Sequence, residues 1–247
     1  MPSGPTPTLQ IQGLCKRFGA VVVADQIDLR LQQGECLGVI GPNGAGKSSL
    51  FHLITGTLAA DAGRIALNGV ELLGLAPFRR VKHGVARAFQ VPQPFAHLSV
   101  FENVLVAATF GADLTQAEAA HSAHLQLQRC GLAARANVLA GSLPLLDRKR
   151  LELAKALATR PRLLLLDEIA GGLTQAEVQQ LVALVHTLRP DHAIIWIEHI
   201  AHALQAVCDR IMVLHFGRKL LEGDPQAVLQ SPLVREIYMG VEDAATA

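Results

Sequence analysis

A run of glycines that closes on a lysine and a serine has the residue types and the spacing needed to bind phosphate. The run consists of Gly41, Pro42, Asn43, Gly44, Ala45, Gly46, Lys47, Ser48 and Ser49. It fits G-x-x-x-x-G-K-[ST], in which glycines permit a tight loop whose backbone N–H groups converge on an anion. The alternative is a glycine-rich turn that binds nothing, and the apolar stretches on both sides of the run argue against it.

Each polar group of this loop has an expected role toward a nucleotide. Lys47 would reach the β- and γ-phosphates, and the Ser48 hydroxyl would ligate Mg²⁺. The helix that starts near Lys47 would direct the positive end of its dipole at the phosphates. The sequence therefore predicts a nucleotide site here.

Three further residues suit the transfer of a phosphoryl group to water. Asp167 and Glu168 follow an apolar run, and His199 follows another. Asp167 would hold the Mg²⁺ that Ser48 also contacts, and Glu168 would act as the general base. A histidine at the end of a strand is more often structural, but beside these groups His199 is expected to hydrogen-bond the γ-phosphate. We predict catalytic roles for Glu168, His199 and Lys47.

The elements that position these residues follow from apolar periodicity. Alternation around residues 9–11 and 27–31 predicts two half-buried strands, and 63–69 predicts a strand that ends in an Asn-Gly hairpin turn. Fully apolar runs at 163–166 and 193–197 predict strands buried on both faces, and 84–90 predicts a further strand. Buried strands that alternate with helices favour a parallel sheet, whose ligands bind beyond the carboxyl ends of the strands.

Residues 91–159 have a helical character with little β-branched content. Thr115 with Glu118, and Thr174 with Glu177 in the region that follows, have the spacing of capping boxes at helix starts. Another helix is expected from about Asp147 to Pro161, where proline stops it. This stretch predicts a helical insertion between two parts of the sheet.

Composition excludes several classes of protein. Half of the 247 residues are apolar, and the formal net charge is +1, so no strong field attracts nucleic acid. No uninterrupted apolar run approaches the roughly 20 residues that a membrane-spanning helix needs. Met1–Thr8 lacks the basic start and apolar core of a signal peptide, so a cytoplasmic protein is expected. The four cysteines, Cys15, Cys36, Cys130 and Cys208, are expected to be reduced core residues.

With these motifs, the chain resembles the nucleotide-binding subunit of ABC transporters nearly from end to end. The resemblance implies an α/β fold of the P-loop NTPase class, with a mostly parallel core sheet. It implies one ABC ATPase domain over 1–247, in which about 91–159 form a helical subdomain. About 9–90 and 160–240 then form the core and an antiparallel β subdomain.

The resemblance also assigns ligands and roles. It implies ATP and Mg²⁺ as cofactors, and it implies that Phe18 stacks on adenine. It assigns to Gln90 a contact with Mg²⁺ and a coupling role toward the membrane subunits. Ser48, Gln90 and Asp167 would thus be the metal ligands.

Four segments are similar, more narrowly, to the ATPases of branched-chain amino-acid importers: Gly84–Gln90, Leu98–Val104, Ile197–His199 and Tyr238–Gly240. The resemblance implies an ATPase that powers uptake of a hydrophobic amino acid or a small amide-type solute. Its partners would be two transmembrane permease subunits and, indirectly, a substrate-binding protein, with no nucleic acid. The chain would lie on the cytoplasmic face of the cell membrane, attached through the permease subunits.

One segment departs from the family. The usual Leu-Ser-Gly-Gly-Gln signature, which contacts the γ-phosphate held by the other subunit of a dimer, aligns with Leu143–Asp147. The side chain of Leu146 would stand where backbone must approach phosphate, and Pro144 lacks an N–H donor. A homodimer would have two impaired sites and a heterodimer one. We therefore expect a second, different ABC ATPase subunit as partner, with Leu146 contacting the nucleotide in trans in a degenerate form.

The sequence also allows other functions. The closest alternatives are the ATPase of a lipid or lipopolysaccharide exporter and a hydrolysis-impaired partner subunit in a heterodimer. A soluble ABC ATPase that acts on DNA or ribosomes is disfavoured, because the chain has neither a long coiled-coil insertion nor a second ATPase unit. The resemblance implies that the binding protein and the membrane subunits, and not this chain, select the substrate.

Overall fold

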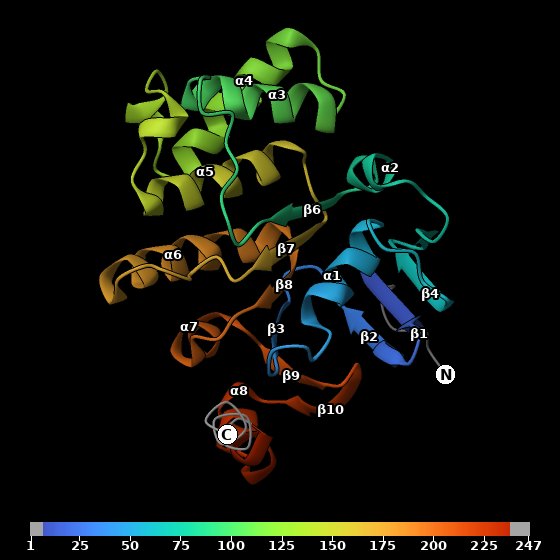
Figure 1. The fold of residues 1–247 in the computed structure, drawn as a ribbon. Coiled ribbons are helices and arrows are strands. Elements are labelled where there is room, and N and C mark those ends of the chain that lie inside the picture. The colour runs from blue at the N-terminus through green and yellow to red at the C-terminus, as the bar shows by residue number, and fades with distance from the viewer. Residues whose placement is uncertain (1–6, 238–247) are drawn as a thin grey trace.

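A computed structural model describes residues 7–237, which form two β-sheets with helices between and around them (Figure 1). The expected leader Met1–Thr8 falls largely outside the described residues. The importer-like ending Tyr238–Gly240 falls wholly outside them.

The smaller sheet is antiparallel, with the strand order β2-β1-β4-β5. Its strands are β1 (Leu9–Phe18), β2 (Val21–Leu31), β4 (Ala62–Leu67) and β5 (Val70–Glu71). Asn68 and Gly69 join β4 to β5 with φ angles of 47° and 81°, the left-handed conformation that such hairpin turns require. The two half-buried strands and the hairpin expected from the sequence are confirmed.

The larger sheet has six strands in the order β10-β9-β3-β8-β7-β6. They are β3 (Cys36–Ile40), β6 (Val85–Ala88), β7 (Leu163–Asp167), β8 (Ala193–Ile197), β9 (Arg210–His215) and β10 (Arg218–Gly223). All neighbours are parallel except β9 and β10, which pair as an antiparallel hairpin at one edge. The mostly parallel core sheet is confirmed, whereas the β9–β10 hairpin was not expected.

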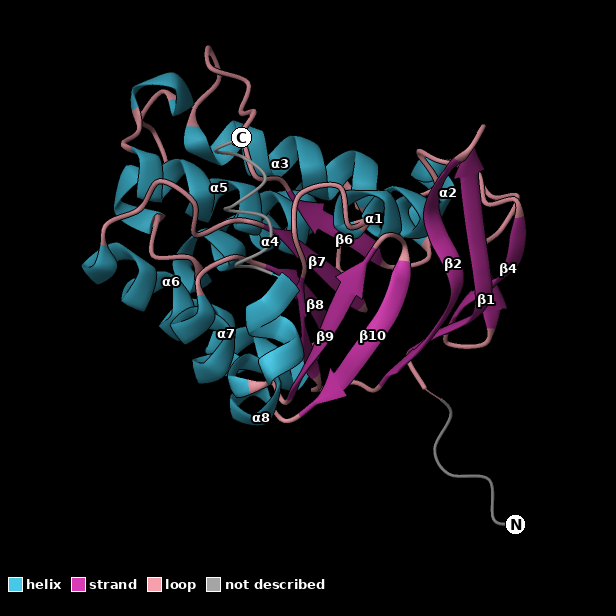
Figure 2. Cartoon of the chain, turned by 60° about the horizontal axis from the view of Figure 1, so that its bottom comes forward, coloured by secondary structure: helices cyan, strands magenta, loops and turns pink. Residues whose placement is uncertain are grey.

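Both faces of the six-stranded sheet are covered (Figure 2). Alternate residues of the strands point to opposite sides: Leu163 and Leu165 pack with α1 and the antiparallel sheet, and Leu164 and Leu166 pack with the other helices. This arrangement explains why β7 reads as an unbroken apolar run. The helices are α1 (Lys47–Thr55), α2 (Pro77–Lys82), α3 (Val100–Gly111), α4 (Gln116–Arg129), α5 (Leu145–Ala158), α6 (Gln175–Leu188), α7 (Ala201–Val207) and α8 (Pro225–Gln230).

Helices α3, α4 and α5 lie together between β6 and β7 in the chain, at the top of Figure 1. Both predicted capping boxes are present, at Thr115 for α4 and at Thr174 for α6, and a third starts α3 at Ser99. Helix α5 begins at Leu145, two residues before the expected start, and ends before Pro161. Cys36, Cys130 and Cys208 are buried and free as expected, whereas Cys15 is only half-buried.

The register of the central strands determines where the site residues meet. Val39 of β3 is paired with Ile197 of β8, Ile197 with Asp167 of β7, and Leu166 with Ala88 of β6. The segments that follow these four strands therefore emerge at one edge of the sheet. They are the glycine-rich loop, the stretch at His199, the stretch at Glu168 and the stretch at Gln90.

Candidate active site

The glycine-rich loop connects β3 to α1 and passes too close to neighbouring backbone to carry side chains at two positions. A Cβ atom at Gly41 would lie 2.2 Å from the carbonyl oxygen of Leu214, and one at Gly46 would lie 2.4 Å from that of Val23. Gly46 also has a φ of 103°. No side chain caps α1. Its first N–H groups lack intrahelical acceptors, so the loop and the helix start together fit a phosphate group.

Lys47 lies over this loop. Its Nζ atom donates hydrogen bonds to the carbonyl oxygens of Gly41, at 2.6 Å, and Pro42, at 3.1 Å. Burial lowers the pKa of the Lys47 ammonium, while Glu168 and Asp167 act to raise it. Phosphate oxygens at this position would replace the two carbonyl acceptors and add negative charge beside the lysine.

Glu168 is held between the two other residues that the sequence linked to the nucleotide. One oxygen of its carboxylate lies 2.9 Å from Nε2 of His199, and the amide nitrogen of Gln90 donates to the other. The Glu168 backbone is left-handed, with φ of 46°, and its N–H donates to the Ile197 carbonyl oxygen at 2.8 Å. The structure thus brings Glu168, Gln90 and His199 together from three separate strands.

Asp167 ends β7 and forms a buried ion pair with Arg87 of β6. The hydroxyl of Ser48, the amide oxygen of Gln90 and the carboxylate of Asp167 are all oxygen donors, the type of ligand that Mg²⁺ prefers, so these residues would suit the predicted metal. Among residues 7–237 no three His, Cys, Asp or Glu side chains cluster as ligands of a metal ion. A site with few protein ligands suits Mg²⁺, which usually keeps several waters and binds through substrate phosphates.

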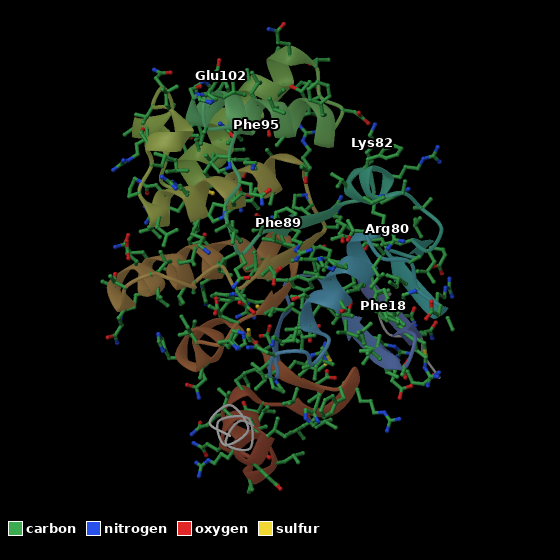
Figure 3. All side chains as sticks on the ribbon, viewed as in Figure 1. Phe18, Arg80, Lys82, Phe89, Phe95 and Glu102 are labelled. Carbon is green, nitrogen blue, oxygen red and sulfur yellow. The ribbon has the colours of Figure 1, made fainter. Side chains whose placement is uncertain are left out.

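Phe18 is the last residue of β1, at the hairpin with β2. Its ring is 54% exposed, and the Lys16 ammonium lies 5.3 Å from the ring centroid. Phe18 pairs with Val21 of β2, two residues before Val23, whose carbonyl oxygen packs against Gly46. Figure 3 labels Phe18 at the strands of the antiparallel sheet. An exposed aromatic face beside the loop fits the stacking role expected for adenine.

The sequence from residue 24 to residue 171 matches the family model described as ABC transporter. The chain belongs to the ABC transporter family. The high-affinity branched-chain amino acid transport ATP-binding protein BraF of Pseudomonas aeruginosa is 34% identical over 250 aligned positions, covering 95% of this chain and 98% of that protein. The lipopolysaccharide export system ATP-binding protein LptB of Acidithiobacillus ferridurans is 32% identical, covering 94% of this chain and 96% of LptB.

A solved structure of the same family has this fold. The ADP conformation of MJ1267, an ATP-binding cassette of an ABC transporter, aligns with a TM-score of 0.86 and 27% identity, covering 95% of this chain and 99% of that one. The chain is thus an ABC ATPase of the P-loop NTPase fold, as the resemblance predicted. Within residues 7–237 no helix combines the length and the apolar character that a bilayer crossing requires.

The ABC signature segment leads into α5 and contains two leucines that differ in exposure. Leu146 is 8% exposed and points into the protein, and its contact with a nucleotide in trans stays a prediction. Leu145, 40% exposed, is the leucine at the surface there. Because α5 starts at Leu145, two residues earlier than expected, successive side chains turn by about 100° to different faces.

An acidic residue occupies the first turn of α5. The carboxylate of Asp147 is 3.0 Å from the Arg135 guanidinium and 3.3 Å from that of Arg150. Pro144 precedes the helix, and its side chain supplies no capping hydrogen bond. The first turn of this helix therefore already contains a carboxylate, whose charge is matched by the guanidiniums of Arg135 and Arg150.

Sequence reasoning missed three charged residues of this ABC site. Arg87 pairs with Asp167, Lys149 of α5 donates to the carbonyl oxygen of Gln90, and Glu198 accepts from the Ala170 and His199 N–H groups at 2.8 and 2.9 Å. Burial raises the pKa of Glu198, although backbone hydrogen bonds oppose the shift. Glu198 directly follows an apolar strand, which was a usable signal. Arg87 and Lys149 depend on contacts between distant segments.

Proposed function

We propose that this chain is the ATP-hydrolysing subunit of an ABC importer for a hydrophobic, branched-chain amino acid or a small amide-type solute. The observation that carries the proposal is the similarity to BraF over nearly all of both chains. The ABC site supports it, because the loop, Asp167, Glu168 and His199 lie at one edge as ATP hydrolysis requires.

Within this proposal each site residue has a role. The N–H groups of Gly41–Ser49 and the Lys47 ammonium bind the phosphates, and Phe18 stacks on adenine. Ser48, Gln90 and Asp167 would hold Mg²⁺, which would supply positive charge against the negative charge of the phosphates. Glu168 accepts a proton from the attacking water, and His199 donates a hydrogen bond toward the γ-phosphate.

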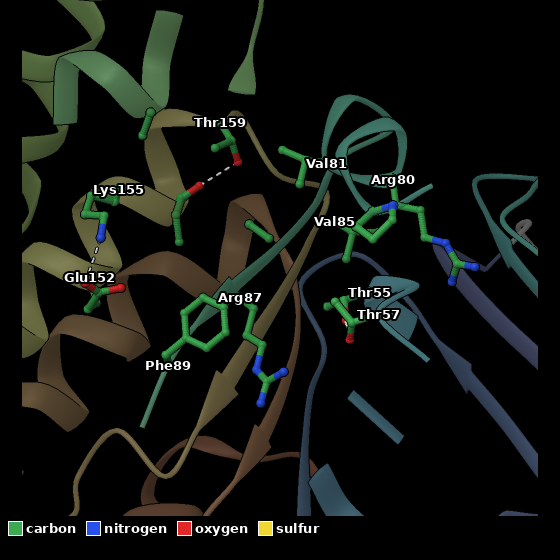
Figure 4. Close-up of a pocket in the computed structure, with 14 residues that line it drawn as sticks. Thr55, Thr57, Arg80, Val81, Val85, Arg87, Phe89, Glu152, Lys155 and Thr159 are labelled. Carbon is green, nitrogen blue, oxygen red and sulfur yellow. Dashed lines mark hydrogen bonds and ion pairs between the residues drawn. The ribbon is translucent and has the colours of Figure 1, made fainter. Parts of the chain in front are cut away.

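Two transmembrane permease subunits are the proposed membrane partners, with a substrate-binding protein acting through them. A cavity of about 320 Å³ beside β6 offers a contact surface for a permease helix (Figure 4). Its walls include Val81, Phe89, Ala107 and Lys155, and we call it the β6 groove. Phe89 is 48% exposed. Attachment through this groove would keep the chain at the cytoplasmic face of the membrane.

The second ATPase subunit is proposed to be a different chain. The α5 start, with Pro144, the exposed Leu145 and the paired Asp147, lacks the glycines and the open backbone of the family signature. An intact signature from another subunit would complete the site on Lys47 and Glu168. A homodimer of this chain that hydrolyses ATP as fast as the assembled complex would contradict this pairing. The pairing would also be contradicted if a variant with Pro144→Ser and Leu145→Gly showed no rise in ATPase turnover.

The alternative function is export of a lipid-type substrate, and the similarity to LptB favours it. The deciding experiment is purification of the tagged chain from membranes, followed by reconstitution of the complex. ATPase stimulation by branched-chain amino acids, urea or short amides, together with a co-purified binding protein, is expected for the importer. Co-purification with lipid-handling subunits and no response to these solutes would contradict import.

A further inference from the structure

Arg87 connects the proposed Mg²⁺ ligand Asp167 to the β6 groove. Its guanidinium pairs with the Asp167 carboxylate, and both side chains are nearly buried, with 10% and 8% exposed. The same guanidinium carbon lies 4.8 Å from the ring centroid of Phe89 and 5.6 Å from that of Phe51. Figure 4 shows Arg87 and Phe89 side by side at the groove. One side chain therefore contacts both the metal-binding acid and the groove wall.

The charge of Arg87 bears directly on metal binding. A guanidinium stays protonated at any pH that a protein tolerates, so Asp167 always faces a positive partner. Mg²⁺ must then bind a carboxylate whose charge is already matched, and it also meets the repulsion of a nearby cation. Arg87 thus weakens the hold of Asp167 on Mg²⁺ for as long as the pair is intact.

The position of Arg87 depends in turn on Phe89. Phe51 is fully buried and is fixed by the core, whereas Phe89 is about half exposed at the groove. A helix that packs into the groove would contact the Phe89 ring and shift the aromatic face that stabilises the guanidinium. Such a contact would change the Arg87–Asp167 pair without touching the nucleotide.

We infer that Arg87 is a positioning residue that controls Mg²⁺ capture by Asp167 and links it to contacts in the β6 groove. The inference rests on the proposed function, because it requires a Mg²⁺-dependent nucleotide site. It adds a route from the groove to the metal that is separate from the side chain of Gln90.

The test measures the Mg²⁺ concentration at half-maximal binding of a fluorescent ATP analogue to the full-length chain. Removal of the charge in Arg87→Met is expected to lower this midpoint about tenfold, the change that ~1.4 kcal/mol produces. Arg87→Lys keeps the positive charge but loses the planar fork of the guanidinium. The Mg²⁺ midpoint of this variant is expected to fall by about threefold. Phe89→Leu, at an exposed ring, is expected to shift the midpoint in the same direction as Arg87→Met.

Arg80→Lys is the matched control. Arg80 borders the same groove and is buried, but its guanidinium donates to the backbone carbonyls of Leu53, Ile54 and Leu75 and not to a carboxylate. Its Mg²⁺ midpoint is expected to equal that of the wild type, even where its melting temperature falls. A shift as large as that of Arg87→Met would overturn the inference, because it would mark a general effect of disturbing the groove.

The remaining outcomes distinguish failure of the proposed function from failure of the role of Arg87. If Arg87→Met does not fold, Arg87→Lys and Phe89→Leu decide, and unchanged midpoints in both overturn the inference. A wild-type chain that binds the analogue without any response to Mg²⁺ overturns the proposed function itself. Normal Mg²⁺ dependence in the wild type with unchanged midpoints in every Arg87 and Phe89 variant overturns only the role of Arg87.

Discussion

The imidazole Nε2 of His199 lies 2.9 Å from a carboxylate oxygen of Glu168, at the ends of two neighbouring parallel strands. The second oxygen of Glu168 accepts from the amide of Gln90. With both oxygens engaged and the backbone in a left-handed conformation, the carboxylate has a fixed orientation. A fixed base suits the activation of a water molecule at one position.

Glu168→Gln is expected to keep nucleotide binding and to lose hydrolysis. The amide preserves the shape of the side chain but cannot take a proton, so turnover should fall by at least about 100-fold. The ATP-bound dimer of this variant with its partner ATPase subunit should then accumulate, which size-exclusion chromatography of the assembled pair with ATP and Mg²⁺ would detect. Glu177→Gln, in the capping box of α6, is the control and should hydrolyse ATP normally. Unchanged turnover in Glu168→Gln would refute the assigned base.

Truncation of Leu146 is expected to destabilise the fold much more than truncation of Leu145. Leu146 is 8% exposed, so Leu146→Ala should lower the free energy of unfolding by about 2–4 kcal/mol through loss of packing. Leu145 is 40% exposed, and Leu145→Ala should change it by less than about 1 kcal/mol. Urea denaturation measures both values. Equal losses would show that the start of α5 differs from the structure.

The sequence was most informative about the site in short segments where the chemistry requires particular residue types at a particular spacing. The loop at 41–49, the Asp167–Glu168 pair and His199 follow from spacing within short segments and from the rule that ligands bind at the carboxyl edge of a parallel sheet. The start of α5 was placed two residues late, because no side-chain cap at Pro144 marks where the helix begins.

Contacts between distant strands were beyond sequence reasoning. Arg87 and Asp167 are 80 residues apart, and they meet only because β6 and β7 pair in parallel with Ala88 opposite Leu166. No local pattern specifies that register. The β9–β10 hairpin differs from these contacts. It was not predicted, although the sequence contains local signals for it in the apolar run Ile211–Leu214 and the turn at Gly217.

Lys149 is expected to stabilise the fold through its hydrogen bond to the segment at Gln90, and to do so more than an exposed lysine in a surface ion pair. Its ammonium is buried within α5 and donates to the Gln90 carbonyl oxygen, and burial lowers its pKa. Lys149→Met should leave that carbonyl unpaired and lower the free energy of unfolding by about 1–3 kcal/mol. Lys82→Met, which removes an exposed ion pair with Asp113, should change it by less than about 1 kcal/mol. Chemical denaturation measures the free energy of unfolding of both variants. Equal changes in the two would contradict the role of Lys149 in holding the segment at Gln90.

His192 is expected to make the fold sensitive to mild acid. The residue is 7% exposed, neither ring nitrogen has a hydrogen-bond partner, and burial lowers its pKa to about 4 from the usual 6.5. Between these two values the unfolded chain binds more protons than the folded one. Stability therefore rises with pH across this window, and the contribution of neutral His192 is lost as the pH falls from 6.5 to 4.

The size of this effect follows from the shift in pKa. Lowering the pKa of His192 from 6.5 to about 4 corresponds to roughly 3.5 kcal/mol at about 1.4 kcal/mol for each factor of ten in proton affinity. His192→Leu cannot be protonated and fills the same buried space, so its unfolding free energy relative to the wild type should rise by about this amount between pH 7 and pH 4. Urea titrations of both proteins at several pH values measure the difference. A difference that stays constant over this range would mean that His192 gains a proton in the folded protein as readily as in the unfolded chain.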